Sequence, residues 1–316
     1  MSISFETTRK LPDRQLLFVV PQTHRADFAE LVLAWHAHGI AVEVLEYGEE
    51  RPDVVELAAR RAPLDAVLLA GPARFAPSTV LPGPIVHNAE GRAIPAAWFP
   101  IKSREANLRF AATAARVHRR GRQTSSVALL GQWHPRYLRL ADRIETILQK
   151  DLPTFRWTGE RIGRDEVVAA LGAGLGLALY VGHGRPAGWV GYYGLRSHHF
   201  DTFDGEPLGG MLSLCCLTAS RRRNSLSYAE ALPLRGVTAA SFGAVKPTLH
   251  TDNTRWAVRI CEALTSGAQS LGELIASAAP PNPSAVLPYR LIGDPLAPLC
   301  AEKAGAQKAA RVKVYP

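Results

Sequence analysis

The sequence predicts an α/β fold, a three-layer α/β/α sandwich built around a mostly parallel sheet. Short apolar runs typical of buried strands alternate with longer amphipathic segments typical of helices. Most neighbouring runs are separated by enough residues for a helical crossover, which parallel strands require. The chain has 316 residues, 47% of them hydrophobic and 21% charged, and is long enough to bury a sizeable globular core.

Residues 1–122 are predicted to form an N-terminal α/β subdomain. A proline-rich passage at 72–84 interrupts its alternating pattern. Ser103 is a suitable N-cap for the last helix of this part, and Gly121 is a suitable stop. The strands are expected at 15–21, 40–48, 64–72 and 93–101, and the helices at 24–39, 53–63 and 103–121.

Residues 123–303 continue the same alternation and are predicted to form a second subdomain. Residues 304–316 are expected to be a flexible basic tail. In the second subdomain the strands are expected at 125–133, 154–159, 175–184, 209–220 and 237–245, and the helices at 137–151, 163–174, 224–236, 252–267 and 270–280. Residues 289–299 are expected to close the folded part.

The composition excludes several classes of protein. No stretch approaches the roughly 20 apolar residues of a membrane span. The polar N-terminus lacks the apolar core of a signal peptide, so we expect a cytoplasmic protein without membrane association. None of the four cysteines (Cys215, Cys216, Cys261 and Cys300) forms a C-x-x-C pair, and the sequence therefore predicts neither a zinc site nor a redox site.

The formal net charge is +9, and the excess is concentrated at 116–122, at 221–224 and in the tail. Such clusters either improve solubility or favour an acidic partner, such as nucleic acid or a peptide that carries Asp or Glu. No RNA-binding, zinc-finger or helix-turn-helix pattern accompanies the charge. Binding of nucleic acid is therefore not expected.

Two predicted strands end in side chains that can do chemistry. The run at 175–184 ends in Gly182-His183-Gly184, and the run at 209–220 contains Cys215-Cys216. Ligands of open parallel sheets bind at the carboxyl ends of strands, and cysteine with histidine is the minimal nucleophile–base pair. Each residue alone is more often structural, because a cysteine at a strand end commonly packs as a small apolar group.

At these residues the sequence resembles a known family. "GLGLALYVGHGRPAGWVG", followed by "MLSLCCLTAS", is similar to the gingipain-type cysteine peptidases of peptidase family C25, which belong to the caspase-like group. The stretches "AIPAAWFPIKSREANLRFAATAARVHR" and "LIGDPLAPL" also resemble that family. The resemblance covers residues 15–300 and implies a caspase-like α/β/α sandwich whose second subdomain is catalytic.

The resemblance implies a role for each matching residue. Cys216 would be the nucleophile and His183 the general base and acid, while the N–H groups of Gly184 and Cys216 would form the oxyanion hole. Alternation along the strand places Cys215 and Cys216 on opposite faces of the sheet. The family pattern favours Cys216 as the nucleophile, with Cys215 as a buried neighbour.

The resemblance leaves the substrate preference open. Secreted members cleave after Arg or Lys and use an acidic residue in a region that here contains Gln132, Arg136, Tyr137 and Arg139. An acidic substrate side chain would suit these arginines, because guanidinium pairs well with carboxylate. The alternative is that both arginines are solvated helix residues. The other residues expected to line the substrate site are Trp189, Leu214 and Lys246, although Trp189 equally suits the core.

The sequence thus predicts a cysteine endopeptidase that hydrolyses peptide bonds in protein substrates, with an intracellular regulatory or processing role. The alternatives are a catalytically silent caspase-like interaction module and a cysteine acyltransferase or transpeptidase. A metal site built from His183, His198 and His199 with the cysteines lacks ligand spacing. No cofactor is expected. A structural calcium ion, restraint by autocleavage or a regulatory partner protein, and the oligomeric state stay open.

Overall fold

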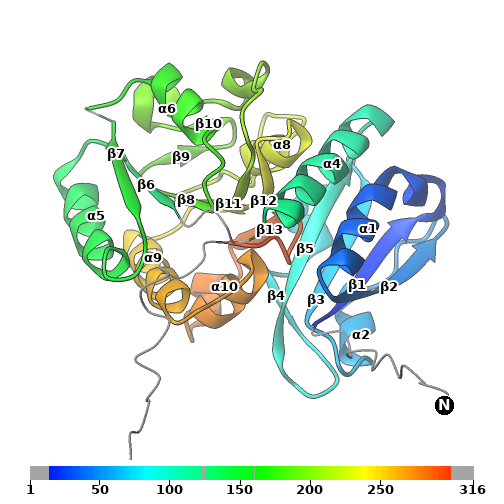
Figure 1. The fold of residues 1–316 in the computed structure, drawn as a ribbon. Helices are drawn as coiled ribbons and strands as arrows, with labels where there is room; N and C mark the ends of the chain where they lie inside the picture. Colours follow the sequence, from blue (N-terminus) through cyan, green and yellow to red (C-terminus); the bar gives the residue numbers. More distant parts are fainter. Residues whose placement is uncertain (1–13, 122–125, 160, 300–316) are drawn as a thin grey trace, which may run out of the picture.

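The computed structural model describes residues 14–121, 126–159 and 161–299. Cys300 and the basic tail expected at 304–316 lie outside these residues. One large sheet runs through the described chain, in the strand order β2-β1-β3-β5-β13-β12-β11-β8-β6-β7, with β4 paired to β5 at the side (Figure 1). The expected α/β sandwich on a mostly parallel sheet is confirmed.

The first half of the chain follows the predicted alternation with small changes. Its strands are β1 (Arg14–Pro21), β2 (Ile40–Tyr47), β3 (Ala66–Pro72), β4 (Ile85–His87) and β5 (Ala93–Ile101). Its helices are α1 (Ala29–Ala37), α2 (Val54–Ala59), α3 (Pro77–Val80) and α4 (Arg104–Arg120).

The second half contributes the other side of the sheet. Its strands are β6 (Val127–Gly131), β7 (Thr154–Thr158), β8 (Leu177–Val181), β11 (Leu208–Leu214), β12 (Thr238–Ala244) and β13 (Tyr289–Gly293), with a small hairpin of β9 (Gly184–Arg185) and β10 (Gly188–Trp189). Its helices are α5 (Pro135–Leu148), α6 (Arg164–Leu171), α7 (Gly191–Gly194), α8 (Tyr228–Leu234), α9 (His250–Thr265), α10 (Leu271–Ala278) and α11 (Pro283–Val286).

Local sequence signals set several helix boundaries. The Ser103 side chain accepts a hydrogen bond from the backbone N–H of Ala106, and α4 ends at Gly121, whose φ is 62°. The helix expected at 24–39 begins later than predicted, because residues Gln22–Phe28 form a 3-10 helix before α1. The helix expected at 53–63 is shorter, since α2 ends at Ala59 ahead of a proline.

The sheet has a helical layer on each face. Successive residues of a strand point to opposite layers. Leu129 belongs to the core cluster that includes residues of α1, α4, α5, α9 and α10, while Leu130 belongs to the cluster that includes residues of α6 and α8. Helix α2 covers the second face at the other end of the sheet. The strands therefore lie between two layers of side chains, with their ends left at the edges of the sandwich.

The last strand joins the two halves. β13 lies between β5 and β12 and runs antiparallel to β12, an orientation that the sequence pattern did not predict. Asp294, directly after β13, accepts a hydrogen bond from the Trp35 indole at 3.2 Å and pairs with His118 Nε2 at 2.6 Å. His118 and Asp294 are 2% and 0% exposed, so a buried pair connects the end of β13 to α4.

Candidate active site

His183 follows the end of β8 and is exposed. Its backbone is held from two sides. The His183 N–H donates to Gln132 Oε1 at 2.8 Å, and the Tyr180 hydroxyl donates to the His183 carbonyl at 3.1 Å. Burial raises the pKa of Tyr180 well above its usual value, so this hydroxyl keeps its proton as a donor. The loop is fixed while the imidazole stays accessible.

The two cysteines that follow β11 lie in different environments. Cys215 is 0% exposed and belongs to the core under α6 and α8. Burial raises the pKa of the Cys215 thiol well above its usual value, which disfavours a reactive thiolate. Cys216 is partly exposed, and its Sγ lies 3.6 Å from Thr248 Oγ1 and accepts from the Thr248 N–H at 3.4 Å. Cys216 is thus the accessible thiol of the pair.

The pairing of β8 with β11 places His183 and Cys216 at the same distance in sequence beyond the ends of two neighbouring strands. β8 and β11 are parallel neighbours, and Val181 lies opposite Leu214 in their register. His183 is two residues beyond Val181, and Cys216 is two residues beyond Leu214. The loops also touch, because a Cβ added to Gly184 would lie 2.4 Å from the Cys216 carbonyl oxygen. Glycine is therefore required at 184 by the close approach of the two loops.

Tyr137, in the first turn of α5, was placed in the substrate region by the sequence but was not predicted to contact His183. Its hydroxyl oxygen lies 3.3 Å from His183 Nε2, and the two rings meet edge to face with centroids 5.5 Å apart. The other edge of the site is formed by His250, whose ring centroid is 5.7 Å from that of Tyr137. Burial, followed by the nearby Arg136 charge, lowers the pKa of His250. No local pattern marks Tyr137, since an apolar position on an amphipathic helix suits the core equally well.

The expected substrate-binding residues separate into two groups. Arg136, Arg139 and Lys246 are exposed, and they have no ion-pair partner among residues 14–121, 126–159 and 161–299. Trp189 and Leu214 are each 1% exposed, so the expectation that they line the cleft is wrong in this structure. Gln132 holds the His183 loop through its hydrogen bond to the His183 N–H.

Packing explains the burial of both side chains. The Trp189 indole stacks on Tyr180 with centroids 4.3 Å apart and donates to Ser213 Oγ at 2.9 Å. Leu214, the last residue of β11, points to the face of the sheet that α5 and α9 cover. The sequence indicated that positions 189 and 214 are apolar, and the packing of the folded chain buries both side chains in the core.

The arginines that follow Cys216, at 221–223, have two kinds of environment. Arg221 forms an ion pair with Glu230, which is fully buried, and also donates to the Ala73 carbonyl beyond β3. The Trp98 indole donates to the same carboxylate at 3.3 Å. Arg221 therefore anchors the loop after Cys216 to the N-terminal half and is not available to a substrate. Arg222 and Arg223 are exposed.

The described residues provide neither a cluster of metal ligands nor a membrane-spanning helix. Within it, no group of three or more His, Cys, Asp or Glu residues is arranged to hold a metal ion. No helix of the described residues is both long and apolar enough to cross a membrane.

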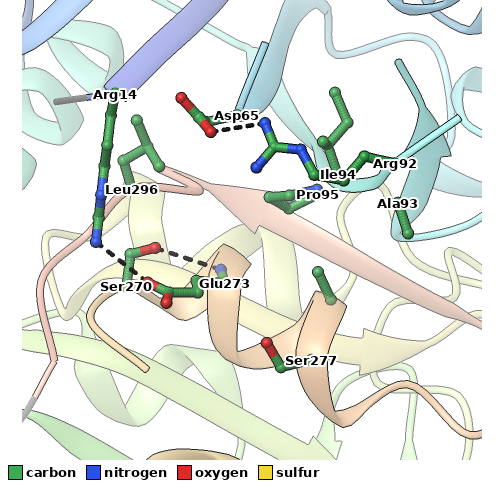
Figure 2. Close-up of a pocket in the computed structure, with 11 residues that line it drawn as sticks. Arg14, Asp65, Arg92, Ala93, Ile94, Pro95, Ser270, Glu273, Ser277 and Leu296 are labelled. Carbon is green, nitrogen blue, oxygen red and sulfur yellow. Dashed lines mark hydrogen bonds and ion pairs between the residues drawn. The ribbon is translucent and has the colours of Figure 1, made fainter. Parts of the chain in front are cut away.

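A hollow of about 420 Å³ lies at the amino-terminal ends of β1, β3 and β5, which β13 and β12 separate from β11 and β8 in the sheet (Figure 2). Its charged residues pair with one another. Arg92 contacts Asp65 at 2.7 Å, and Arg14 contacts Glu273 at 3.1 Å. These pairs neutralise each other, and the hollow holds neither member of the cysteine–histidine pair.

Histidine and cysteine beyond the ends of neighbouring parallel strands, in an α/β/α sandwich, are the arrangement that the resemblance to the cysteine peptidases implied. Residues 121–300 match the family model described as Peptidase family C25. The chain therefore belongs to peptidase family C25.

Solved structures agree with this fold. The Arg-specific cysteine proteinase gingipain R (RgpB) aligns with a TM-score of 0.72 at 15% identity, over 92% of this chain and 79% of that one. The complex of Porphyromonas gingivalis RgpB pro- and mature domains gives 0.70 at 15% identity, over 90% and 79%. A structure described only as a protease gives 0.68 at 12% identity, over 92% and 79%. No curated protein matches the chain.

Proposed function

We propose that this protein is a cysteine endopeptidase in which Cys216 is the nucleophile and His183 transfers protons. The observation that carries the proposal is the register of β8 and β11, which puts both residues two positions beyond paired strand ends. The accessible thiol of Cys216 and the exposed imidazole of His183 support it, as does membership of a cysteine peptidase family. The substrates would be proteins or peptides.

In the first half of the reaction, the Cys216 thiol gives its proton to the His183 imidazole and its sulfur attacks the peptide carbonyl carbon. The oxygen gains negative charge, which the N–H groups of Gly184 and Cys216 would stabilise. The imidazolium then gives its proton to the amide nitrogen. The C–N bond breaks, the amine leaves, and a thioester to Cys216 remains.

In the second half, water enters where the amine left. The His183 imidazole takes a proton from water, and the oxygen attacks the thioester carbonyl. The C–S bond breaks, the carboxylic acid leaves, and the proton returns to the sulfur. The fixed His183 backbone supports this cycle, because the same imidazole must address the thiol, the amine and the water from one position.

The proposal is tested by covalent labelling. We expect peptidyl-acyloxymethyl ketones to label Cys216, as located by mass spectrometry, and we expect the label to be lost in His183→Ala. The reagents should carry Arg, Asp and Leu in turn as the first residue, so that the result does not depend on one assumed preference.

The remaining thiols of the described chain serve as internal controls. Burial raises the pKa of both the Cys215 and Cys261 thiols, so neither should react while the protein is folded. Labelling of Cys261, or no labelling by any reagent with a folded protein, would contradict the proposal. The second result would instead favour a catalytically silent module.

Gly184→Ala is expected to lower the rate of Cys216 labelling about 100-fold, because a displacement near 1 Å is enough to misplace reacting groups. The new methyl group would lie 2.4 Å from the Cys216 carbonyl oxygen and 2.5 Å from Cys215 Sγ, so one loop must move. The matched control is Gly48→Ala, whose added Cβ would meet nothing within 4 Å. Equal labelling rates in the two variants would show that the loops do not need this close approach.

A further inference from the structure

We propose that Tyr137 is the positioning residue of this site: its hydroxyl oxygen holds Nε2 of His183 and leaves Nδ1 as the nitrogen that exchanges protons with Cys216 and the substrate. The inference rests on the proposed function, since it assigns the atoms of His183 within that reaction. It adds to the pair a third residue, which no sequence motif indicated.

The imidazole ring of His183 is restrained by a contact to its Nε2 atom. Gln132 and Tyr180 fix the backbone of His183, but neither contacts the ring nitrogens. Tyr137 supplies the ring contact that the structure records, at 3.3 Å from Nε2 and with the two ring planes at 88°. A histidine side chain with a fixed backbone and one held nitrogen has a single orientation left, with the other nitrogen free.

Tyr137 is itself rigidly placed. Its side chain is 5% exposed and its ring packs between the rings of His183 and His250. Its backbone N–H donates to the His134 carbonyl at 2.9 Å in the first turn of α5. The side chain of His134 caps the same turn by accepting from the Arg136 N–H. A side chain on a capped and packed helix holds its partner more accurately than one on a loop.

The proposed reaction decides which partner donates. Nδ1 must carry a lone pair to accept the thiol proton, so the single proton of the neutral ring belongs on Nε2. The Tyr137 oxygen then accepts from Nε2–H. Burial raises the pKa of Tyr137, which keeps the group a neutral phenol at the pH of the reaction.

A neutral phenol orients the ring without adding negative charge. The titratable and charged groups that face Tyr137 and His183 are Tyr180 on β8, Cys215 and Cys216 beyond β11, His134 and Arg136 on α5, and His250 on α9. None of these described groups is a carboxylate. No ion pair joins His183 to a carboxylate among the described residues, and the contribution of Tyr137 is one of geometry and tautomer.

The test compares Tyr137→Phe with Tyr47→Phe. Both changes remove one hydroxyl group from a packed tyrosine, and Tyr47 donates to the Ala70 carbonyl in the N-terminal half, away from the dyad. Protein labelled with ¹⁵N-histidine gives the tautomer of each ring in long-range ¹H–¹⁵N spectra, and His183→Gln identifies the signals of His183.

In the parent protein and in Tyr47→Phe, we expect His183 to carry its proton on Nε2. In Tyr137→Phe we expect a mixture of tautomers, with kcat for a peptide substrate lowered about 10- to 100-fold and KM little changed. Loss of the tautomer-fixing group costs up to about 10⁴-fold in the serine triad, where that group is a carboxylate, and a neutral phenol is worth less.

Two results would overturn the inference: a proton on Nδ1 in the parent protein, or an unchanged tautomer and unchanged kcat in Tyr137→Phe. The spectra do not require turnover, so failure of the proposed function is seen separately. If Cys216 is never labelled, the protease proposal fails, and the spectra still report whether Tyr137 fixes His183.

Discussion

Cys216→Ala is expected to lower kcat/KM for peptide hydrolysis by about 10⁴-fold or more, whereas Cys215→Ala is expected to keep most of the activity. Removing a catalytic nucleophile leaves only the contribution of substrate binding and of the oxyanion donors. Cys216 is the accessible thiol, placed level with His183 by the pairing of β8 and β11. Cys215 is fully buried on the opposite face of the sheet.

The adjacent cysteines make this an unusually well-matched pair, because the two variants remove the same atoms one residue apart. Cys215→Ala should cost only about 1 kcal/mol of stability, as expected for a small buried cavity. Hydrolysis is measured with a mixed peptide library, so that no substrate preference is assumed. Equal loss of activity in both variants, or full activity in Cys216→Ala, would refute the assignment of the nucleophile.

Asp294→Ala is expected to lower the free energy of unfolding by about 3–5 kcal/mol, because it leaves three donors without their acceptor and each unsatisfied buried donor costs about 1–3 kcal/mol. Asp294 receives His118 Nε2 at 2.6 Å, the Trp35 indole at 3.2 Å and the Leu296 N–H at 2.9 Å. All of these contacts would be lost together, and urea unfolding measures the sum.

The control for this prediction is Glu105→Ala. Glu105 pairs with Arg109 at 2.6 Å, but its side chain is 80% exposed, so its loss should change stability by no more than about 0.5 kcal/mol. If Asp294→Ala were as mild as Glu105→Ala, the contacts around Asp294 would not hold the end of β13 to α1 and α4.

The sequence predicted the order of elements well because alternating apolar and amphipathic runs report burial directly. It did not predict the orientation of β13, since the pattern of a five-residue strand is the same in either direction and the path of the preceding chain decides the direction. Gly182-His183-Gly184 and Cys215-Cys216 were found because reactive side chains at strand ends are visible in the sequence. The structure brings these two segments together.

Tyr137 and Trp189 could not be interpreted in the same way. Both are aromatic residues at positions that suit a core, and only the packing distinguishes them. Tyr137 contacts the His183 ring because the first turn of α5 lies beside the loop that follows β8, while the Trp189 ring stacks on buried Tyr180. Such differences depend on contacts between distant segments, which periodicity does not encode.

The position of β13 has a consequence for how the protein folds while it is being synthesised. The strand is made after β1 to β12, yet it occupies the middle of the sheet between β5 and β12. While the chain emerges from the ribosome, the partial sheets on either side carry open edges that can pair wrongly. These edges can pair with β13 only after residues 289–293 have left the ribosome. The complete sheet therefore forms late in biosynthesis, and a chaperone that shields those edges would matter most just before that moment.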